Sequence, residues 1–382
     1  MIQPPQPFAD LPAGLVEELL AKAGDAGEAM LASFQDLRDS RDELRKQLRD
    51  RNLVRHESEL GYPPEPSTCG TDGSYGVERL LSADFVACAA VAVEGLTPPK
   101  EARHWPEPRF KTFVSIETHA EDTTTLVRSI MIGRELVLAS EAPHDVVMVD
   151  GSMALPLIYL NQALNASASN ADRGLARTFL AEIPDYLSSY LEVLSTRRTD
   201  KQYIALPKYT SRREIGNEVG WPMTRDDRGI LSQVLEAGEY SDPRPLEPPE
   251  QQWHLNVGRL RKDVKDRIEP VVSDVVAALE STFVTYYKPH LWLPALRLEM
   301  SREIATNRHR LAVILRGLKH QCATSAMLEP YPIYLADRTV KALARALPAF
   351  RHIATQHVSE SYEGDIADVF FAMHSYRSEA GA

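Results

Sequence analysis

Apolar and polar positions along the chain group into runs that predict intermixed strands and helices. The run 146–149 is short, apolar and rich in β-branched residues, so it predicts a buried strand that ends at Asp150 in an Asp-Gly-Ser triplet. The same triplet begins at Asp72, and the apolar run 85–93 follows it after a short gap. Two such triplets beside apolar runs suggest two carboxylates at one edge of a sheet, although each triplet alone is also ordinary turn chemistry.

Helical spacing of apolar residues marks the other main elements. A long amphipathic helix is expected over about 15–53, and the alternating charges of its second half suit either solvent or a partner helix. Prolines make the segments 286–289 and 292–299 resemble edge strands, while 216–252 resembles a loop with one short helix. Further helices are predicted over about 123–141, 155–165, 174–195 and 308–323 and after 330–340, strands over 113–117 and 203–208, and a helix running into a strand over 271–285.

Length, cysteine usage and charge narrow the class of protein. The 382 residues are enough for one large domain or two ordinary ones. Three widely spaced cysteines argue against a disulfide framework or a zinc site and favour a reducing cytoplasm. No segment has the apolar length of a membrane span, and the first residues lack a signal-peptide core. The net charge of −11 argues against a general nucleic-acid coat, but it leaves room for a local basic strip or for a partner that delivers DNA.

The mixture of strands and helices predicts an α/β layered domain. We expect two parts in the chain. Residues 1–60 form an N-terminal arm and long helix that contacts a second copy or a partner, and residues 61–382 form the main domain. A long helix that simply packs on its own domain is an equally open interpretation of the first part.

An ordered set of motifs resembles the NurA nucleases, a family that works with the hexameric DNA-translocating ATPase HerA. Each motif is short, and their shared order over about residues 68–350 carries the resemblance. The motifs are Asp72-Gly73-Ser74, Arg134-Glu135, Val149-Asp150-Gly151-Ser152, Pro207-Lys208-Tyr209-Thr210-Ser211-Arg212, Arg297-Leu298-Glu299 and Tyr331-Pro332-Ile333-Tyr334-Leu335-Ala336-Asp337.

The resemblance implies an RNase H-like mixed β-sheet flanked by helices and extended by the N-terminal helix. It implies a Mn²⁺- or Mg²⁺-dependent deoxyribonuclease that cleaves single strands and degrades duplex ends in the 5′–3′ direction. It also implies a cytoplasmic homodimer on a HerA-type hexamer, with a role in DNA-end processing during repair or in anti-phage defence. The chain has no Gly-x-x-x-x-Gly-Lys-Ser/Thr loop, so ATP-driven motion must come from the partner.

The resemblance assigns a metal site to Asp72, Glu135, Asp150 and Asp337. Asp72 and Asp150 are expected as principal ligands and the other two as supporting ligands, because phosphodiester hydrolysis with two divalent ions needs several carboxylates. Archaeal relatives carry a histidine where this chain has Asp337, and an acid can replace an imidazole as an oxygen ligand. Lys208 is a catalytic candidate that would neutralise a phosphate oxygen.

Simpler roles are open for each of these residues. Asp72 and Asp150 also suit turn or cap positions, and Glu135 suits the solvated face of a helix. Asp337 suits a charge at a helix N-terminus, and Lys208 suits an ordinary surface lysine.

Other residues compete for the same roles. Arg212 is a second candidate for the phosphate contact, and Glu117 and Glu141 are alternatives to Glu135. Arg297 and Glu299 lie two apart on an expected strand, so they share one face and fit a mutual ion pair. Two alternative functions follow from the same sequence: a catalytically weak adaptor that caps and regulates an ATPase, and an RNA-cleaving enzyme of similar fold.

Overall fold

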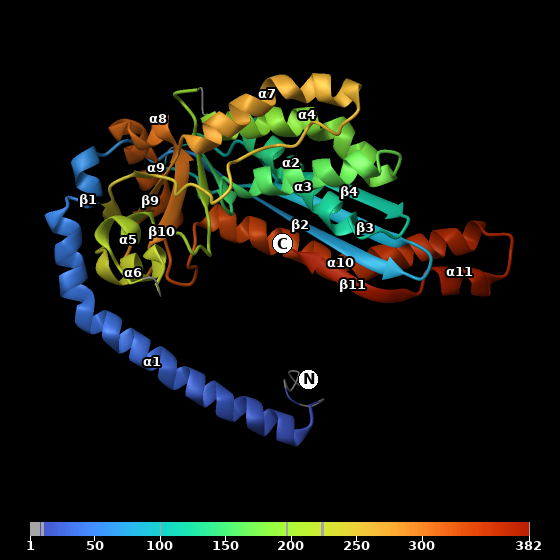
Figure 1. Cartoon of the computed structure of the whole chain (residues 1–382), viewed down its shortest axis with the longest axis horizontal. Coiled ribbons are helices and arrows are strands. Elements are labelled where there is room, and N and C mark those ends of the chain that lie inside the picture. The colour runs from blue at the N-terminus through green and yellow to red at the C-terminus, as the bar shows by residue number, and fades with distance from the viewer. Residues whose placement is uncertain (1–7, 9–10, 100, 196–197, 223–224, 382) are drawn as a thin grey trace.

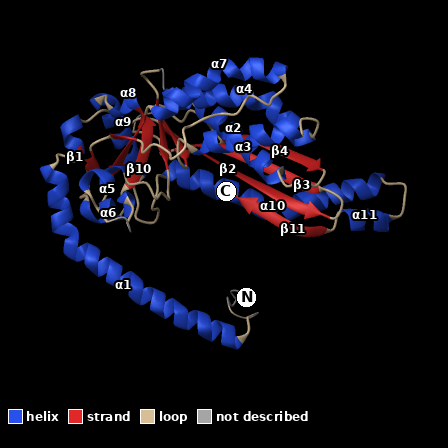
Figure 2. Cartoon of the chain, viewed as in Figure 1, coloured by secondary structure: helices blue, strands red, loops and turns tan. Residues whose placement is uncertain are grey.

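One mixed sheet with helices on both faces forms the body of the protein (Figure 2). The computed structural model describes residues 8, 11–99, 101–195, 198–222 and 225–381. The strands are β1 (Val54–His56), β2 (Thr68–Leu80), β3 (Asp84–Glu94), β4 (Arg109–Glu117), β5 (Val146–Asp150), β6 (Gln202–Leu206), β7 (Glu239–Ser241), β8 (Arg244–Pro245), β9 (Thr282–Tyr287), β10 (Leu296–Ser301) and β11 (Ser375–Gly381).

The helices follow the predicted segments closely in the first half of the chain. They are α1 (Ala13–Asp50), the 3-10 helix η1 (Glu57–Leu60), α2 (Thr123–Glu141), α3 (Leu155–Ser169), α4 (Gly174–Ser195), α5 (Glu214–Val219), α6 (Asp227–Val234), α7 (Lys262–Glu280), α8 (Arg302–Ala305), α9 (Arg308–Gln321), α10 (Tyr331–Ser361) and α11 (Ile366–Ala372).

Parallel pairing is confined to the middle of the sheet. The strand order is β1-β7-β9-β10-β6-β5-β2-β3-β4, with β11 paired to β2 and β8 paired to β9. The central strand β5 is parallel to both β2 and β6, and the other pairs are antiparallel. Because β5 is covered on both faces, four of its five residues are buried and apolar, as a strand inside a parallel sheet requires.

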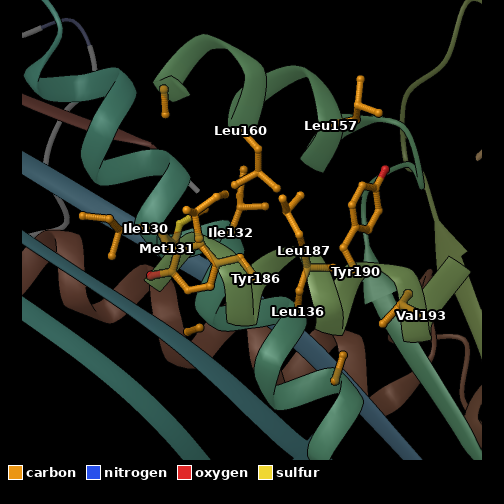
Figure 3. Close-up of a cluster of buried hydrophobic side chains, with 14 of the residues drawn as sticks. Ile130, Met131, Ile132, Leu136, Leu157, Leu160, Tyr186, Leu187, Tyr190 and Val193 are labelled. Carbon is orange, nitrogen blue, oxygen red and sulfur yellow. The ribbon is translucent and has the colours of Figure 1, made fainter. Parts of the chain in front are cut away.

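A large apolar core fills the space between one face of the sheet and helices α2, α3, α4 and α7. Figure 3 shows its centre, where Ile130 and Leu136 of α2 meet Leu160 of α3 and Tyr186 and Leu187 of α4. These side chains are almost fully buried, and each such residue contributes roughly 1.5–3 kcal/mol of transfer free energy. This core fixes α2 against the sheet and therefore fixes Glu135, which lies on α2.

Helices α9 and α10 cover the opposite face of the sheet (Figure 1). The first turn of α10 lies so close to β2 that a Cβ atom added to Gly70 would be 2.6 Å from the carbonyl carbon of Pro332. Glycine is therefore required at position 70, and this close approach brings the start of α10 to the middle of the sheet.

The two halves of α1 have different surroundings. In the second half, Leu37, Leu44 and Leu48 join a core with helices α5 and α6, and Arg45 pairs with Glu239 at 2.6 Å. The first half extends away from the body (Figure 1). The part of α1 up to Phe34 carries apolar residues that are 44–59% exposed, namely Leu15, Leu19, Leu20, Met30, Leu31 and Phe34. The division of the chain at residues 60 and 61 stays a prediction.

Two expectations for the second half of the chain were wrong. The segment 216–252 holds most of α5, all of α6 and the short strands β7 and β8, because its apolar residues pack against α1 and β9. Strands β9 and β10 are interior to the sheet, with β10 between β9 and β6. The prolines that suggested edge strands, Pro289 and Pro294, lie in the loop that connects these two strands.

The sequence predicted neither a membrane span nor a disulfide framework. Within the described residues, no helix combines the length and the hydropathy needed to cross a membrane. The three cysteines are free and buried.

The contact between Gly70 and α10 can be tested by adding one methyl group. Gly70→Ala should lower the free energy of unfolding by about 1–3 kcal/mol, because the new Cβ collides with backbone that cannot move without shifting α10. Thermal or urea unfolding measures this change. The matched control is Gly24→Ala on exposed α1, where nothing lies within 4 Å, and it should stabilise by roughly 0.5–1 kcal/mol. Equal effects at the two positions would contradict this account.

Candidate metal site

Asp72 lies inside a strand and not at the end that the sequence suggested. Strand β2 continues to Leu80 because β3 pairs with it along most of its length. Its parallel pairing with β5, however, ends at Thr71. Asp72 therefore lies where β5 separates from β2, and its side chain is buried, with 6% of the residue exposed.

Asp150 is the last residue of β5, as the sequence predicted. Gly151 follows with a φ of 90°, a conformation that glycine adopts without strain, and the chain turns away there. Both aspartates accept a hydrogen bond from the next backbone N–H, at 2.7 Å for Asp72 and 2.9 Å for Asp150. The turn interpretation therefore describes part of their contacts, but neither residue caps a helix.

The third carboxylate comes from α10. Gly70 and Gly76 of β2 both face this helix, so the two-residue period of a strand points Asp72 toward it as well. Carboxylate oxygens of Asp72, Asp150 and Asp337 lie within 4.8 Å of one another. Asp337 is the seventh residue of α10, beyond its first turn, so the interpretation as a helix N-terminal charge was wrong.

Glu135 approaches the same region from α2, on the other side of the sheet. It is buried, with 7% exposed, and it accepts a hydrogen bond from Thr71 Oγ1 at 3.2 Å, so the solvated-acid interpretation was wrong. It lines the same cavity as the three aspartates but does not belong to their cluster. The alternatives lie elsewhere: Glu117 accepts the backbone N–H of Leu175, and Glu141 is exposed.

Lys208 places a positive charge between these acids. It follows β6 by two residues, and β6 is the parallel neighbour of β5. Its Nζ atom lies 2.9 Å from Asp150 Oδ2, 2.9 Å from Glu329 Oε2 and 3.8 Å from Asp337 Oδ1. Lys208 is therefore a paired, half-buried cation and not an ordinary surface lysine.

Burial and mutual repulsion change the protonation of the acids. Burial, and then the charge of Asp150, raise the pKa of Asp72 to about 7. Burial, and then the charges of Asp72 and Asp150, raise the pKa of Glu135 well above its ordinary value. Burial disfavours the ammonium form of Lys208, but the charges of Asp150 and Glu329 outweigh this and raise its pKa. A further positive charge is thus favoured here, because it would stabilise the charged forms of Asp72 and Glu135.

A buried ion network fixes the loop that follows Asp150. Glu299 accepts hydrogen bonds from Ser152 Oγ at 2.7 Å and from the Met153 backbone at 2.8 Å. Arg297 bonds to Glu299 at 3.0 Å and to both carboxylate oxygens of Glu214 at 2.7 Å. The mutual pair expected for Arg297 and Glu299 is confirmed, and Arg297 is only 1% exposed.

A cavity of about 1190 Å³ opens over the acids, and the residues around it extend the predicted site. Arg212, the second candidate for a phosphate contact, lines this cavity. Tyr209 also lines it and is 95% exposed, and no role was predicted for it. Glu329 was not predicted at all. The available signal was an acid directly before the Pro-Tyr-Pro start of α10.

The residues present fit a divalent cation. Hard cations prefer carboxylate oxygens, and three of them converge here from β2, β5 and α10. Asp72 Oδ2 is buried and has no hydrogen-bond partner among the described residues, a costly arrangement that a bound cation would relieve. The site roles of Asp72, Glu135, Asp150, Lys208 and Asp337 stay predictions.

Solved structures share this arrangement of strands and helices. The crystal structure of the NurA nuclease from Sulfolobus solfataricus is similar with a TM-score of 0.60 and 12% identity, over 91% of this chain and 98% of that chain. The chain has the fold of a NurA nuclease. The fold class predicted from the sequence, an RNase H-like mixed sheet flanked by helices, is confirmed.

Two further NurA crystal structures are similar at lower scores. One, with manganese, has a TM-score of 0.49 and 13% identity over 88% of this chain and 99% of that chain. The other has a TM-score of 0.49 and 14% identity over 90% of this chain and 99% of that chain. No protein-family model matches the sequence, and neither does any curated protein sequence.

Cation binding should depend on pH through Asp72. Because burial and Asp150 raise its pKa to about 7, Asp72 must lose a proton before it can bind a cation below that pH. Mn²⁺ affinity should therefore rise as the pH increases from about 6 to about 8, by up to roughly tenfold per unit for one released proton. Calorimetric titration in buffers of different ionisation enthalpy measures both the affinity and the proton. An affinity that is constant over this range would contradict the assignment.

The same carboxyl group should lower stability at high pH in the absence of metal. A carboxyl group whose pKa is raised on folding costs stability as the pH rises from about 4, its unfolded value, to about 7. Asp72→Asn removes this cost, so its melting temperature in EDTA should exceed that of the wild type at pH near 8 and differ less near pH 4. Thermal unfolding at the two pH values is the measurement, and a variant less stable than the wild type near pH 8 argues against the predicted repulsion.

Proposed function

We propose that this protein is a metal-dependent deoxyribonuclease. The observation that carries the proposal is the convergence of Asp72, Asp150 and Asp337 beside the Lys208 ammonium, in an open cavity of a NurA-like fold. Phosphodiester hydrolysis develops negative charge on the attacking and leaving oxygens. Divalent cations held by acids, together with a fixed ammonium, would stabilise that charge.

The chain's own residues divide the work in this proposal. Asp72, Asp150 and Asp337 hold Mn²⁺ or Mg²⁺, with Glu135 as a supporting group from the α2 side of the sheet. The bound cation supplies Lewis-acid stabilisation and a water of lowered pKa. Lys208 faces a non-bridging phosphate oxygen, and Arg212 on the rim of the cavity binds a neighbouring phosphate.

An exposed aromatic residue in the lining of the cavity favours an unpaired strand as substrate. Tyr209 lies next to Lys208 in sequence, and its side chain is 95% exposed on the rim. An exposed aromatic ring gives a base a surface on which to stack, worth roughly 1–3 kcal/mol per base. We therefore favour cleavage of single strands and of duplex ends that have been opened, over cleavage inside an intact duplex.

A translocating partner completes the proposal. The net charge of −11 weakens attraction for free DNA, and the sequence holds no phosphate-binding loop for ATP. A HerA-type hexameric ATPase would deliver the strand to a homodimer of this chain. The exposed apolar half of α1 offers a surface for one of these contacts. DNA-end processing in repair and anti-phage defence are the two processes that such a complex would serve.

The proposed activity depends on the aspartates. Asp150→Asn should reduce Mn²⁺-dependent cleavage of linear DNA by at least about a hundredfold, because it removes a ligand charge and an anchor of Lys208. The matched control is Asp274→Asn on the exposed face of α7, which should retain wild-type activity. Cleavage of labelled single-stranded DNA, duplex DNA and RNA is measured in the presence of Mn²⁺ or of EDTA, each with and without a HerA-type ATPase.

The outcomes separate the candidate functions. Cleavage of DNA that EDTA stops and Asp150→Asn abolishes supports the nuclease. Preferred cleavage of RNA identifies the alternative enzyme. A wild-type protein that cleaves nothing in any combination supports the adaptor, and the proposal is then rejected.

A further inference from the structure

Lys208 forms an ion pair with Asp150, which is also a proposed ligand of the cation, so the lysine needs another partner when a cation is bound. Its Nζ atom is 2.9 Å from Asp150 and 3.8 Å from Asp337, both of which belong to the acid cluster. A divalent cation in that cluster would compete for Asp150 and repel the ammonium. Without another anchor, Lys208 would either block the cation or leave the site.

Glu329 is that other anchor. Its Oε2 atom lies 2.9 Å from Lys208 Nζ, and it is not among the three clustered acids. This oxygen is buried and no hydrogen bond reaches it among the described residues, so the charge pair with Lys208 is the contact that compensates its burial. Glu329 lies directly before Pro330, the N-cap of α10, and a proline restricts the backbone of the residue before it to extended conformations.

The two cavities that Lys208 lines indicate from which side Glu329 holds the ammonium. Lys208 lines both the cavity of about 1190 Å³ over the acids and a neighbouring cavity of about 330 Å³. Glu329 lines only the smaller cavity, whereas Asp150 and Asp337 line only the larger. Glu329 therefore holds the ammonium from the side that faces away from the acid cluster.

We propose that Glu329 is a positioning residue that holds the Lys208 ammonium back from the acid cluster, so that one site accommodates both the cation and the lysine. This inference rests on the proposed function. Without a cation the ammonium pairs with both Asp150 and Glu329. When a divalent cation takes Asp150, Lys208 keeps Glu329 as its partner and remains on the wall of the larger cavity, where a phosphate would lie.

Two other roles for Glu329 make different predictions. A fourth metal ligand would act on the cation whether or not Lys208 is present. A residue that only stabilises the loop before α10 would change the melting temperature but not cation affinity. A double-mutant cycle with Lys208 separates the three roles, because a positioning residue acts through its partner alone.

The experiment measures Mn²⁺ binding without DNA, from the loss of the free-ion electron paramagnetic resonance signal. Four proteins are compared: wild type, Glu329→Gln, Lys208→Met and the double variant. Glu329→Gln should weaken binding on the order of tenfold, because the ammonium then competes more strongly for Asp150. Lys208→Met should tighten binding, and adding Glu329→Gln to it should change little. Glu250→Gln, on an exposed loop, is the matched control and should bind as the wild type does.

Cleavage kinetics at saturating Mn²⁺ give a second readout. Glu329→Gln should lower kcat on single-stranded DNA on the order of tenfold with KM nearly unchanged, and Glu329→Asp should recover part of that loss. If Glu329→Gln weakens Mn²⁺ binding equally with and without Lys208, the inference is overturned in favour of a direct metal ligand. If Glu329→Gln leaves Mn²⁺ affinity unchanged, it is overturned in favour of a structural role. If the wild type binds no Mn²⁺ and cleaves no DNA, the proposed function fails and this inference fails with it.

Discussion

Repulsion between clustered carboxylates, of which Asp72 is buried and Asp150 and Asp337 are half-buried, is the constraint on which the site depends. Asp72, Asp150 and Asp337 converge within 4.8 Å, and Glu135 adds a fourth acid from α2. Such an arrangement is unfavourable unless protons or cations compensate it. The protein supplies part of that compensation with Lys208 and the rest with protons, since burial and Asp150 raise the pKa of Asp72 to about 7. A bound cation would offset this repulsion, which otherwise lowers the stability of the folded protein.

The surrounding structure keeps the acids together in spite of this repulsion. Parallel pairing of β5 with β2 and β6 brings Asp72, Asp150 and Lys208 to one edge, and the close contact at Gly70 adds the start of α10. On the other side of Asp150, the buried Arg297 network fixes the loop through Glu299. A buried ion pair of this kind adds little net stability, but breaking it leaves an unpaired charge, so it favours one fixed geometry.

The sequence predicted those elements whose pattern is local. The β-branched run of β5 and the 3.6-residue spacing of α2 and α4 depend on their own residues, and their bounds agree with the structure. The position of Asp72 depends on a partner instead, because β3 extends β2 beyond the expected turn. The interior position of β10 likewise depends on the strands beside it, which no local pattern of prolines reveals. Glu329 acquires its role only through the fold, since it lies 121 positions from Lys208 in the sequence (329 − 208).

The most direct test of this account is the anomalous diffraction of a crystal soaked in Mn²⁺. We predict an anomalous peak bounded by carboxylate oxygens of Asp72, Asp150 and Asp337, with the Lys208 ammonium withdrawn from Asp150 toward Glu329. A peak at another place, or no peak at a concentration that supports cleavage, would contradict the claim that these acids converge in order to bind a cation.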